Sequence, residues 1–247
     1  KAFYVDENGN YTDERQLLHL DIINKFKKDV YCIQQDQPIA ILTGGPPASG
    51  KSTFLKTYSP YLADDQIMKV DADAIRAMLP EYQGWNSAAT HLETKDIVNT
   101  LLTDKEIGIP CKYDIIYDGT MNRVANYEPL IGTLKRLGYK IYIVYMDKVP
   151  YKDVVDRMLH RYQTSKDHRF VPIDVIDDFF TKGKDALHQL KSKVNGYMVI
   201  DASDKEYRIL EKGGEDLPTQ RNYVAIGEKN KAGKLVAKLI QASHLLK

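Results

Sequence analysis

Cysteine, long apolar runs and net charge are all scarce in this sequence. Cys32 and Cys111 are the only cysteines among 247 residues, and two thiols so far apart do not form a disulfide framework. We therefore expect a reducing compartment, the cytoplasm. No apolar run is long enough for a transmembrane helix, and no secretory signal is visible. The sequence has 35 Lys and Arg residues and 34 Asp and Glu residues, so its net charge is only +1. Such a chain has no overall positive potential that would attract nucleic acid or an anionic membrane, and we expect neither as a partner.

A glycine-rich stretch near residue 45 carries most of the functional information. Residues 39–42 are apolar, Thr43 and Gly44 follow, and residues 45–52 have the spacing of a phosphate-binding loop. The nucleotide-binding residues expected from this stretch are Gly45, Pro46, Pro47, Ala48, Ser49, Gly50, Lys51, Ser52 and Thr53. The glycines let backbone N–H groups point inward around an anion, and a helix that starts near Lys51 adds its free N–H groups and positive dipole end. Lys51 can reach the β- and γ-phosphates, and the Ser52 hydroxyl can bind Mg²⁺.

The order of apolar and amphipathic segments predicts an α/β fold of the P-loop NTPase kinase type. Strands alternate with helices, which favours a parallel sheet flanked by helices on both faces. We expect a single domain with a helical extension (1–36), a core (37–195) that has a lid at about 157–172, and an extension (196–247) with a small β-hairpin and a helix.

Three parts of the chain have more specific predictions for their local structure. A helix from Thr12 to about residue 29 should bury Leu17, Leu18, Ile22, Ile23 and Phe26. A helix over 86–102 should bury Leu92, Ile97, Leu101 and Leu102. In the last extension, strand 197–200 should pair with 207–210, and 233–246 should be helical.

Acidic residues follow two of the predicted strands, at the sheet edge where ligands bind in such folds. Asp71 and Asp73 come after the second strand, and Asp118 ends the third. Phosphoryl transfer to an alcohol needs a base within reach of the hydroxyl. Asp73 is either that base or the N-cap of the next helix, and the two roles can coexist. Asp118 is either a metal-side acid or a turn residue.

Arginines in the second half of the chain suggest a lid over the triphosphate. Arg157 and Arg161 are four residues apart on one predicted helix, and Arg169 follows in a polar segment. Such arginines stabilise the charge that develops on the γ-phosphate, and a lid excludes water. A solvated face is the simpler explanation for Arg157. His91 receives no role, and for Trp85 packing is the simpler explanation, with stacking on a ring as the alternative.

The ordered set of motifs resembles the zeta-toxin family of P-loop kinases over about residues 12–200. The resemblance rests on Gly-Gly-Pro-Pro-Ala-Ser-Gly-Lys-Ser (44–52), Val-Asp-Ala-Asp-Ala-Ile-Arg (70–76) and Tyr-Asp-Gly-Thr (117–120), extended by His-Arg-Tyr (160–162) and Arg-Phe-Val-Pro (169–172). Two positions differ from that family. Asp118 stands where those toxins have Glu, and Met121-Asn122 stands where they present Arg.

The resemblance implies a phosphotransferase that uses ATP and Mg²⁺ on a small-molecule hydroxyl. In the best-known members the acceptor is the 3′-hydroxyl of UDP-N-acetylglucosamine, and an antitoxin is the partner protein. By position, the resemblance makes Lys51, Asp73, Arg161 and Arg169 catalytic. The residues that it places at the acceptor site are Asp71, Arg76, Glu93, Asp118, Thr120 and Asn122. The residues that it places at the metal site are Ser52 and Asp118.

Two other functions remain open. A polynucleotide 5′-hydroxyl kinase can use a similar loop and base, and its basic groove would come from Lys182, Lys184, Lys191 and Lys193. A nucleotide-dependent switch without a small acceptor is the second. The Asn-Lys-x-Asp segment that reads guanine in GTPases is absent from the sequence.

Overall fold

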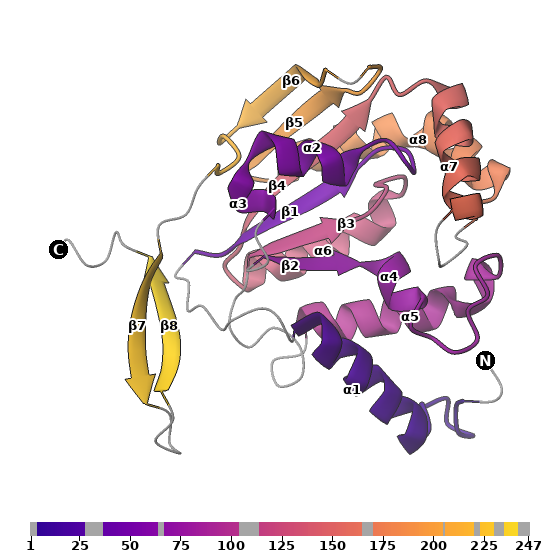
Figure 1. Cartoon of the computed structure of the whole chain (residues 1–247), viewed down its shortest axis with the longest axis vertical. Helices are drawn as coiled ribbons and strands as arrows, with labels where there is room; N and C mark the ends of the chain where they lie inside the picture. The colour runs from indigo at the N-terminus through magenta and orange to yellow at the C-terminus, as the bar shows by residue number, and fades with distance from the viewer. Residues whose placement is uncertain are drawn as a thin grey trace.

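The computed structural model describes residues 4–27, 37–63, 67–103, 114–164, 170–204, 206–219, 223–229 and 235–241. In this part of the chain, a six-stranded sheet with the strand order β2-β3-β1-β4-β5-β6 forms the centre, and helices lie on both of its faces (Figure 1). The predicted α/β fold is therefore confirmed. Cys32, Cys111 and Arg169 lie outside the described residues.

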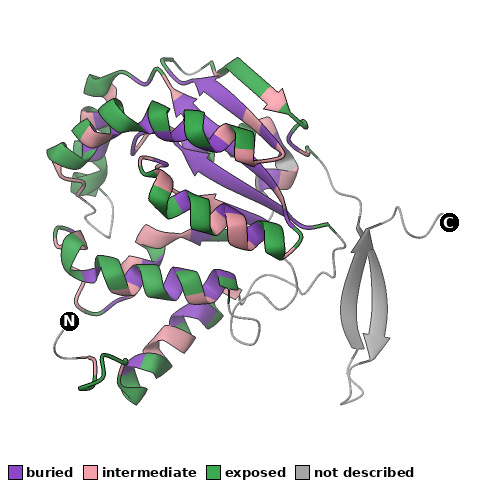
Figure 2. Cartoon of the chain, turned by 180° about the vertical axis from the view of Figure 1, so that it is seen from behind, coloured by how far each residue is buried: buried purple, intermediate pink, exposed green. Residues whose placement is uncertain are grey.

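Five strands of the main sheet are parallel, and the sixth, at one edge, is antiparallel. The parallel strands are β1 (Ile39–Gly44), β2 (Met68–Asp71), β3 (Ile115–Asp118), β4 (Lys140–Asp147) and β5 (Gly196–Asp201), and the edge strand is β6 (Arg208–Gly214). Every residue of β1 is buried, because helices cover both faces of the sheet, as Figure 2 shows.

The helices connect these strands in turn. They are α1 (Asp13–Lys27), α2 (Lys51–Tyr58), α3 (Pro60–Ala63), α4 (Ala72–Arg76), α5 (Ser87–Thr103), α6 (Val124–Arg136), α7 (Tyr151–Thr164), α8 (Ile173–Leu190) and the short 3₁₀ helix η1 (Lys191–Lys193). The α1 helix begins after Thr12, whose hydroxyl accepts a hydrogen bond from the backbone of Arg15 at 3.4 Å. The α6 helix stops before Gly138, which has a φ of 84°.

Two hydrophobic clusters fill the space on either side of the sheet. Alternate residues of β1 belong to different clusters, since Ala40 and Leu42 face one side and Ile39 and Ile41 face the other. The first cluster includes buried side chains of α1, α5 and α6, and the second includes side chains of α2, α3 and α7. The long helix α8 contributes to both. This layering fixes the carboxyl ends of the parallel strands at one edge.

Three sequence-based expectations for these segments are wrong in part. Residues 235–241 form strand β8 (Leu235–Gln241) rather than a helix, and they pair with β7 (Tyr223–Lys229) in a separate two-stranded sheet. Seven consecutive cross-strand pairs outweigh the weak helical pattern. Leu17 and Leu92 are 64% and 52% exposed, so neither belongs to the buried face of its helix. The pairing of strand 197–200 with 207–210 is confirmed by β5 and β6.

No helix in the described part of the chain is both long enough and apolar enough to cross a membrane.

Candidate active site

The phosphate loop (residues 45–52) lies between β1 and α2. Gly45 and Gly50 have φ values of 110° and 88°, in the left-handed region that favours glycine. A β-carbon on Gly45 would also lie 2.5 Å from the carbonyl oxygen of Met146, so this position has no room for a side chain. The N-terminus of α2, at Gly50, has no side-chain cap. A helix that begins in this way can present the N–H groups of its first turn to a phosphate.

Lys51 is the buried cation of this loop. Its Nζ donates to the carbonyl oxygens of Pro46 at 3.1 Å and Gly45 at 3.5 Å, and the residue is 9% exposed. Ser49 is also buried, and its hydroxyl has no hydrogen-bond partner among the described residues. Ser52 is exposed in the first turn of α2. The structure thus brings the predicted nucleotide-binding residues together in one loop around the start of a helix.

Polar side chains meet at the carboxyl ends of β1, β2 and β3. Asp71 and Asp118 are partners in the parallel register of β2 and β3. The Thr43 hydroxyl, from β1, donates to Asp118 Oδ1 at 2.8 Å and accepts from the backbone N–H of Gly119 at 3.1 Å. Hydrogen bonds therefore join the strand that leads into the phosphate loop to the acidic residue predicted at the metal and acceptor.

The segment after β3 is held in a fixed shape. The N–H of Gly45 donates to the carbonyl oxygen of Thr120 at 3.0 Å. Met121 is buried with a φ of 54°, and its N–H donates to the hydroxyl of the buried Tyr127 at 3.1 Å. The half-buried Asn122 follows directly. This segment is thus anchored to the phosphate loop on one side and to α6 on the other.

The two acids after β2 have different local roles. Asp71 caps α4, because its Oδ1 accepts from the N–H groups of Asp73 at 2.8 Å and Ala74 at 3.3 Å. The alternative explanation of Asp73 as the cap is therefore wrong. Asp73 is half-buried and forms an ion pair with Arg76, whose side chain is 11% exposed. Burial lowers the pKa of Arg76, and its Nε has no hydrogen-bond partner in the described structure.

Arg157, rather than Arg161, contacts the phosphate loop. Its Nη1 donates to the carbonyl oxygen of Ala48 at 3.3 Å, and its Nη2 lies 3.4 Å from Asp153 Oδ2 on the same helix, α7. Arg161 is exposed one turn further along α7. Arg169 cannot be placed, since it lies outside the described residues. Sequence spacing gave no sign of the Arg157 contact, because it depends on how α7 docks against the loop.

Glu93 lies in an ionic cluster between α1 and α5, formed by Arg15, His19, Glu81 and Glu93 (the Arg15 cluster). Arg15 is 5% exposed, and its Nη2 donates to Glu81 at 2.6 Å and Glu93 at 2.9 Å. His19 Nε2 lies 2.6 Å from Glu93 Oε1. Burial acts to raise the pKa of Glu93, but the hydrogen bonds from Arg15 and His19 outweigh it and lower the pKa. The acceptor-binding role of Glu93 stays a prediction.

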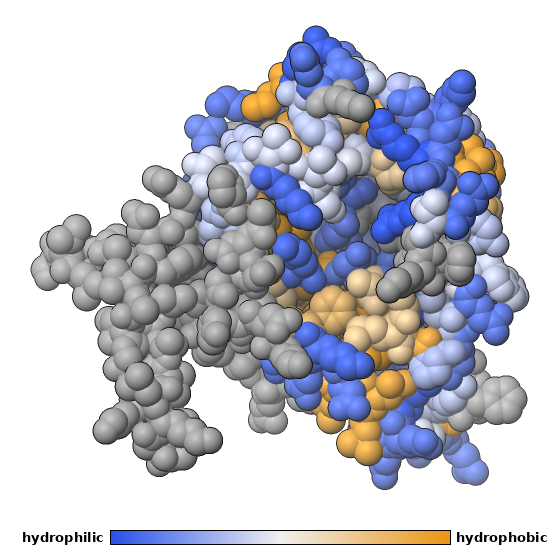
Figure 3. Space-filling view, in the orientation of Figure 1, coloured by the Kyte–Doolittle hydropathy of each residue, from blue (hydrophilic) through white to orange (hydrophobic). Residues whose placement is uncertain are grey.

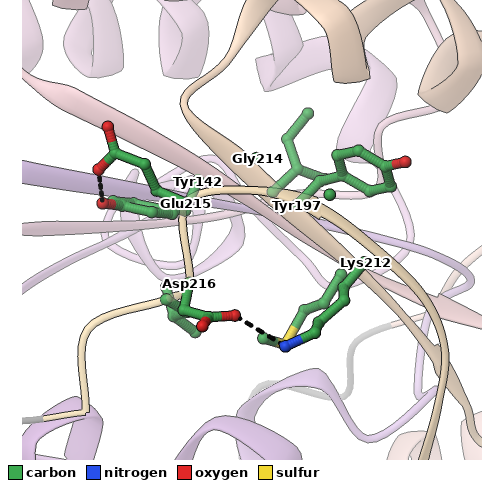
Figure 4. Close-up of a pocket in the computed structure, with 10 residues that line it drawn as sticks. Tyr142, Tyr197, Lys212, Gly214, Glu215 and Asp216 are labelled. Atoms are coloured by element: carbon green, nitrogen blue, oxygen red, sulfur yellow. Dashed lines mark hydrogen bonds and ion pairs between the residues drawn. The ribbon is translucent and has the colours of Figure 1, made fainter.

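A cavity of about 230 Å³ lies between β5 and β6, towards the amino ends of β4 and β5. Figure 4 shows Tyr142 hydrogen-bonded to Glu215 at 3.1 Å and Lys212 bonded to Asp216 at 3.0 Å at its wall. None of the predicted site residues lines this cavity. On the face shown in Figure 3, by contrast, hydrophilic residues gather around a hollow near the carboxyl ends of the parallel strands.

The comparisons with known proteins agree with the fold described above. The family model described as Zeta toxin matches residues 23–213. A solved structure from the PezAT chromosomal toxin-antitoxin system of Streptococcus pneumoniae is similar, with a TM-score of 0.62, 18% identity and 82% of each chain covered.

The AvrRxo1-ORF1:-ORF2 complex is also similar. Its structure with ATP has a TM-score of 0.65 and 17% identity, over 83% of this chain and 69% of that one. Its structure with sulphate ions has a TM-score of 0.64 and 18% identity over the same shares. No match was found among curated proteins. At these identities, the similarity to solved structures shows the fold alone.

Proposed function

Because this chain belongs to the Zeta toxin family, we propose that it is a phosphotransferase that moves the γ-phosphate of ATP to a hydroxyl group of a small molecule. The observation that carries the proposal is the hydrogen bond from Thr43 to Asp118, which ties the phosphate-loop strand to the acidic strand end. Phosphoryl transfer depends on positioning and on charge stabilisation, and an edge joined in this way supports both.

On the donor side, the backbone N–H groups of residues 45–52 and the Lys51 ammonium would hold the β- and γ-phosphates of ATP. Arg157 lies against the Ala48 carbonyl and would add a cation beside the triphosphate. Arg161 and Arg169 remain the proposed lid arginines. Their role would be to stabilise the charge of the transferred group and to exclude water.

Mg²⁺ would be held by the Ser52 hydroxyl and the Asp118 carboxylate. When bound, the ion neutralises charge on the phosphates. The described residues contain no group of three or more His, Cys, Asp or Glu side chains that could hold a metal by themselves. One hydroxyl and one carboxylate, from Ser52 and Asp118, fit Mg²⁺, which uses one or two carboxylates together with water and substrate phosphates.

On the acceptor side, Asp73 would accept the proton of the attacking hydroxyl while the oxygen bonds to the γ-phosphorus and ADP leaves. Its ion pair with Arg76 would orient the carboxylate. The remaining acceptor residues would be Asp71, Glu93, Asp118, Thr120 and Asn122. The family resemblance makes the 3′-hydroxyl of UDP-N-acetylglucosamine the first acceptor to test, and it makes an antitoxin protein the proposed partner.

A polynucleotide acceptor is less well supported. The four lysines that could form a basic groove each pair with a carboxylate of this chain. The pairs are Lys182 with Asp178, Lys184 with Asp147, Lys191 with Glu211, and Lys193 with Glu128. Their charge is therefore largely neutralised before any nucleic acid binds.

The test is a transfer assay with γ-labelled ATP, Mg²⁺ and a metabolite panel that includes UDP-N-acetylglucosamine. We expect a labelled product, and we expect Asp73→Asn to lower kcat by about 10²- to 10⁴-fold with ATP binding retained. Asp13→Asn is the matched control, since Asp13 is an exposed acid in the first turn of α1. Absence of product from every pool, with Asp73→Asn like wild type in ATP turnover, would refute the proposal.

A further inference from the structure

The loop that leads into α5, residues 81–86 (the 81–86 loop), is held by its own side chains. Asn86 Nδ2 donates to the carbonyl oxygen of Glu81 at 2.8 Å, which closes the loop across its base. Gly84 is buried and has a φ of 83°, in the left-handed region. Its carbonyl oxygen accepts a hydrogen bond from the Tyr82 hydroxyl at 3.2 Å. The loop therefore holds this carbonyl in a defined position, and the oxygen has a second lone pair for another donor.

Contacts of α7 and Phe170 connect the phosphate loop to the 81–86 loop. These loops come after β1 and β2, and β3 lies between those two strands in the sheet. Arg157 of α7 donates to a carbonyl oxygen of the phosphate loop at 3.3 Å. The N–H of Phe170 donates to the Gly84 carbonyl oxygen, also at 3.3 Å. The Phe170 ring lies edge-on to the Tyr162 ring of α7, with 5.8 Å between the ring centroids, so these contacts together span the site.

A buried arginine of α1 attaches the 81–86 loop to the helices beneath it. Arg15 Nη1 and Nη2 donate to Oε1 and Oε2 of Glu81 at 3.0 Å and 2.6 Å, and such a two-bond arrangement fixes direction as well as distance. The same guanidinium donates to Glu93 of α5 at 2.9 Å. The hydrogen bonds from Arg15 lower the pKa of Glu81 to about 2, so the pair stays charged at neutral pH. The position of the loop relative to α5 therefore depends on α1.

The hydrogen bond between Phe170 and Gly84 is sensitive to the position of the loop. At 3.3 Å it lies near the long end of the hydrogen-bond range, so a displacement of the loop by about 0.5 Å would break it. A proposed lid that stands open admits water to the γ-phosphate. The oxygen of water then bonds to the γ-phosphorus as ADP leaves, and a water proton passes to solvent. Inorganic phosphate forms in place of a phosphorylated acceptor.

We propose that Glu81 is a positioning residue for phosphoryl transfer. Its pair with Arg15 holds the 81–86 loop where Gly84 receives Phe170, and that contact keeps α7 closed over the bound donor. The inference rests on the proposed function, because it concerns the choice between acceptor and water for the same phosphate. It gives Glu81 and the N-terminal helix a role in the reaction that the sequence motifs did not indicate.

The first experiment measures how the γ-phosphate is divided between acceptor and water. Wild type, Glu81→Gln and Glu14→Gln are incubated with γ-labelled ATP, Mg²⁺ and the metabolite panel, and labelled inorganic phosphate is measured against labelled organic product. The glutamine at position 81 keeps the side-chain size, but its NH₂ group cannot accept a hydrogen bond from Arg15. We expect the ratio of inorganic phosphate to product to rise about fivefold in Glu81→Gln. Glu14→Gln, at an exposed acid in the first turn of α1, is the matched control and should keep the wild-type ratio.

This ratio separates positioning from a merely structural role, because both products come from one reaction and the ratio does not depend on the amount of folded enzyme. Product formed with a wild-type ratio in Glu81→Gln overturns the inference while the phosphotransferase function stands. An equal rise in Glu81→Gln and Glu14→Gln also overturns it. Absence of product from the wild type would count against the proposed function itself, and the inference would fall with it.

A double-mutant cycle tests whether Glu81 acts through the contact with Phe170. Phe170→Ala removes the ring that packs against Tyr162, and it should also raise the ratio of inorganic phosphate to product about fivefold. If both substitutions open the same contact, the double variant should show about the same ratio as either single variant. Independent effects would multiply to about 25-fold, and that result would overturn the inference.

Discussion

Replacement of Arg15 by Met should destabilise the protein in a way that depends on pH. Arg15 is 5% exposed and donates to two carboxylates, Glu81 and Glu93. Removal of one partner from a buried ion pair costs about 3–5 kcal/mol. We expect the lower end, about 3 kcal/mol, because the Glu81 side chain is 32% exposed and solvent screens part of its charge. The melting temperature should fall by about 9 °C for a chain of this size.

The sign of the pH effect follows from the two acids. The hydrogen bonds from Arg15 lower the pKa of Glu81 from 4.5 to about 2. A carboxyl group with a depressed pKa stabilises the fold above its unfolded value, and that stability is lost as the pH falls from 4.5 towards 2. Without Arg15, Glu93 keeps the burial that raises its pKa and loses its main counter-ion. Lowering the pH should therefore reduce the free energy of unfolding less in the variant than in the wild type.

Urea denaturation at pH 7 and pH 4 measures the difference in unfolding free energy between wild type and Arg15→Met. The difference should shrink at pH 4, and Glu93→Gln in the Arg15→Met background should recover part of it at pH 7. Arg208→Met is the control, because Arg208 is 65% exposed in its pair with Asp204 and should cost less than about 1 kcal/mol. A difference that stays constant or grows at pH 4 would refute the electrostatic reasoning.

Three other substitutions test the phosphate loop and its edge. Lys51→Met should lower kcat/KM by about 10²-fold or more, because a preorganised phosphate contact is lost, and transfer assays measure this. Gly50→Ala should weaken ATP binding, since φ is 88° and the new β-carbon would lie 2.6 Å from the Tyr207 hydroxyl. When Tyr207→Phe is added to the Gly50→Ala variant, calorimetry should show recovery of only the ATP affinity that the steric contact removes. Full recovery of the affinity would mean that the left-handed backbone at residue 50 imposes no cost on alanine. Thr43→Val should lower stability by about 1–3 kcal/mol in urea melts, because Asp118 and a backbone N–H lose their partner. Unchanged unfolding would show that this hydroxyl does not hold the edge together.

The central part of the fold could be predicted from sequence because its signals are local. An apolar run, glycines at fixed spacing and a helical start give β1, the phosphate loop and α2 without any long-range information. The acids at the strand ends could be found for the same reason, since parallel strands bring their carboxyl ends to one edge. Asp71, Asp118 and Thr43 accordingly lie at that edge.

Sequence patterns revealed less where contacts between distant segments decide the structure. The Arg15 cluster joins residues 66 and 78 positions apart, so no local pattern could reveal that Glu93 faces α1. The Arg157 contact with Ala48 spans 109 positions. For residues 235–241, pairing with β7 overrides a weak helical preference. The exposed Leu17 has the spacing of a buried residue, but the helix turns it away from the sheet.

The contacts of Lys51 with the Pro46 and Gly45 carbonyl oxygens have a consequence for turnover. If Lys51 binds the donor phosphates as proposed, donor binding would be a ligand exchange, in which the ammonium gives up two backbone oxygens to gain phosphate oxygens. The net gain in affinity is the difference between these two sets, so it is smaller than the phosphate contacts alone would provide. The same two carbonyl oxygens would be available to Lys51 when ADP leaves, so nucleotide release would not leave the buried ammonium without a hydrogen-bond acceptor.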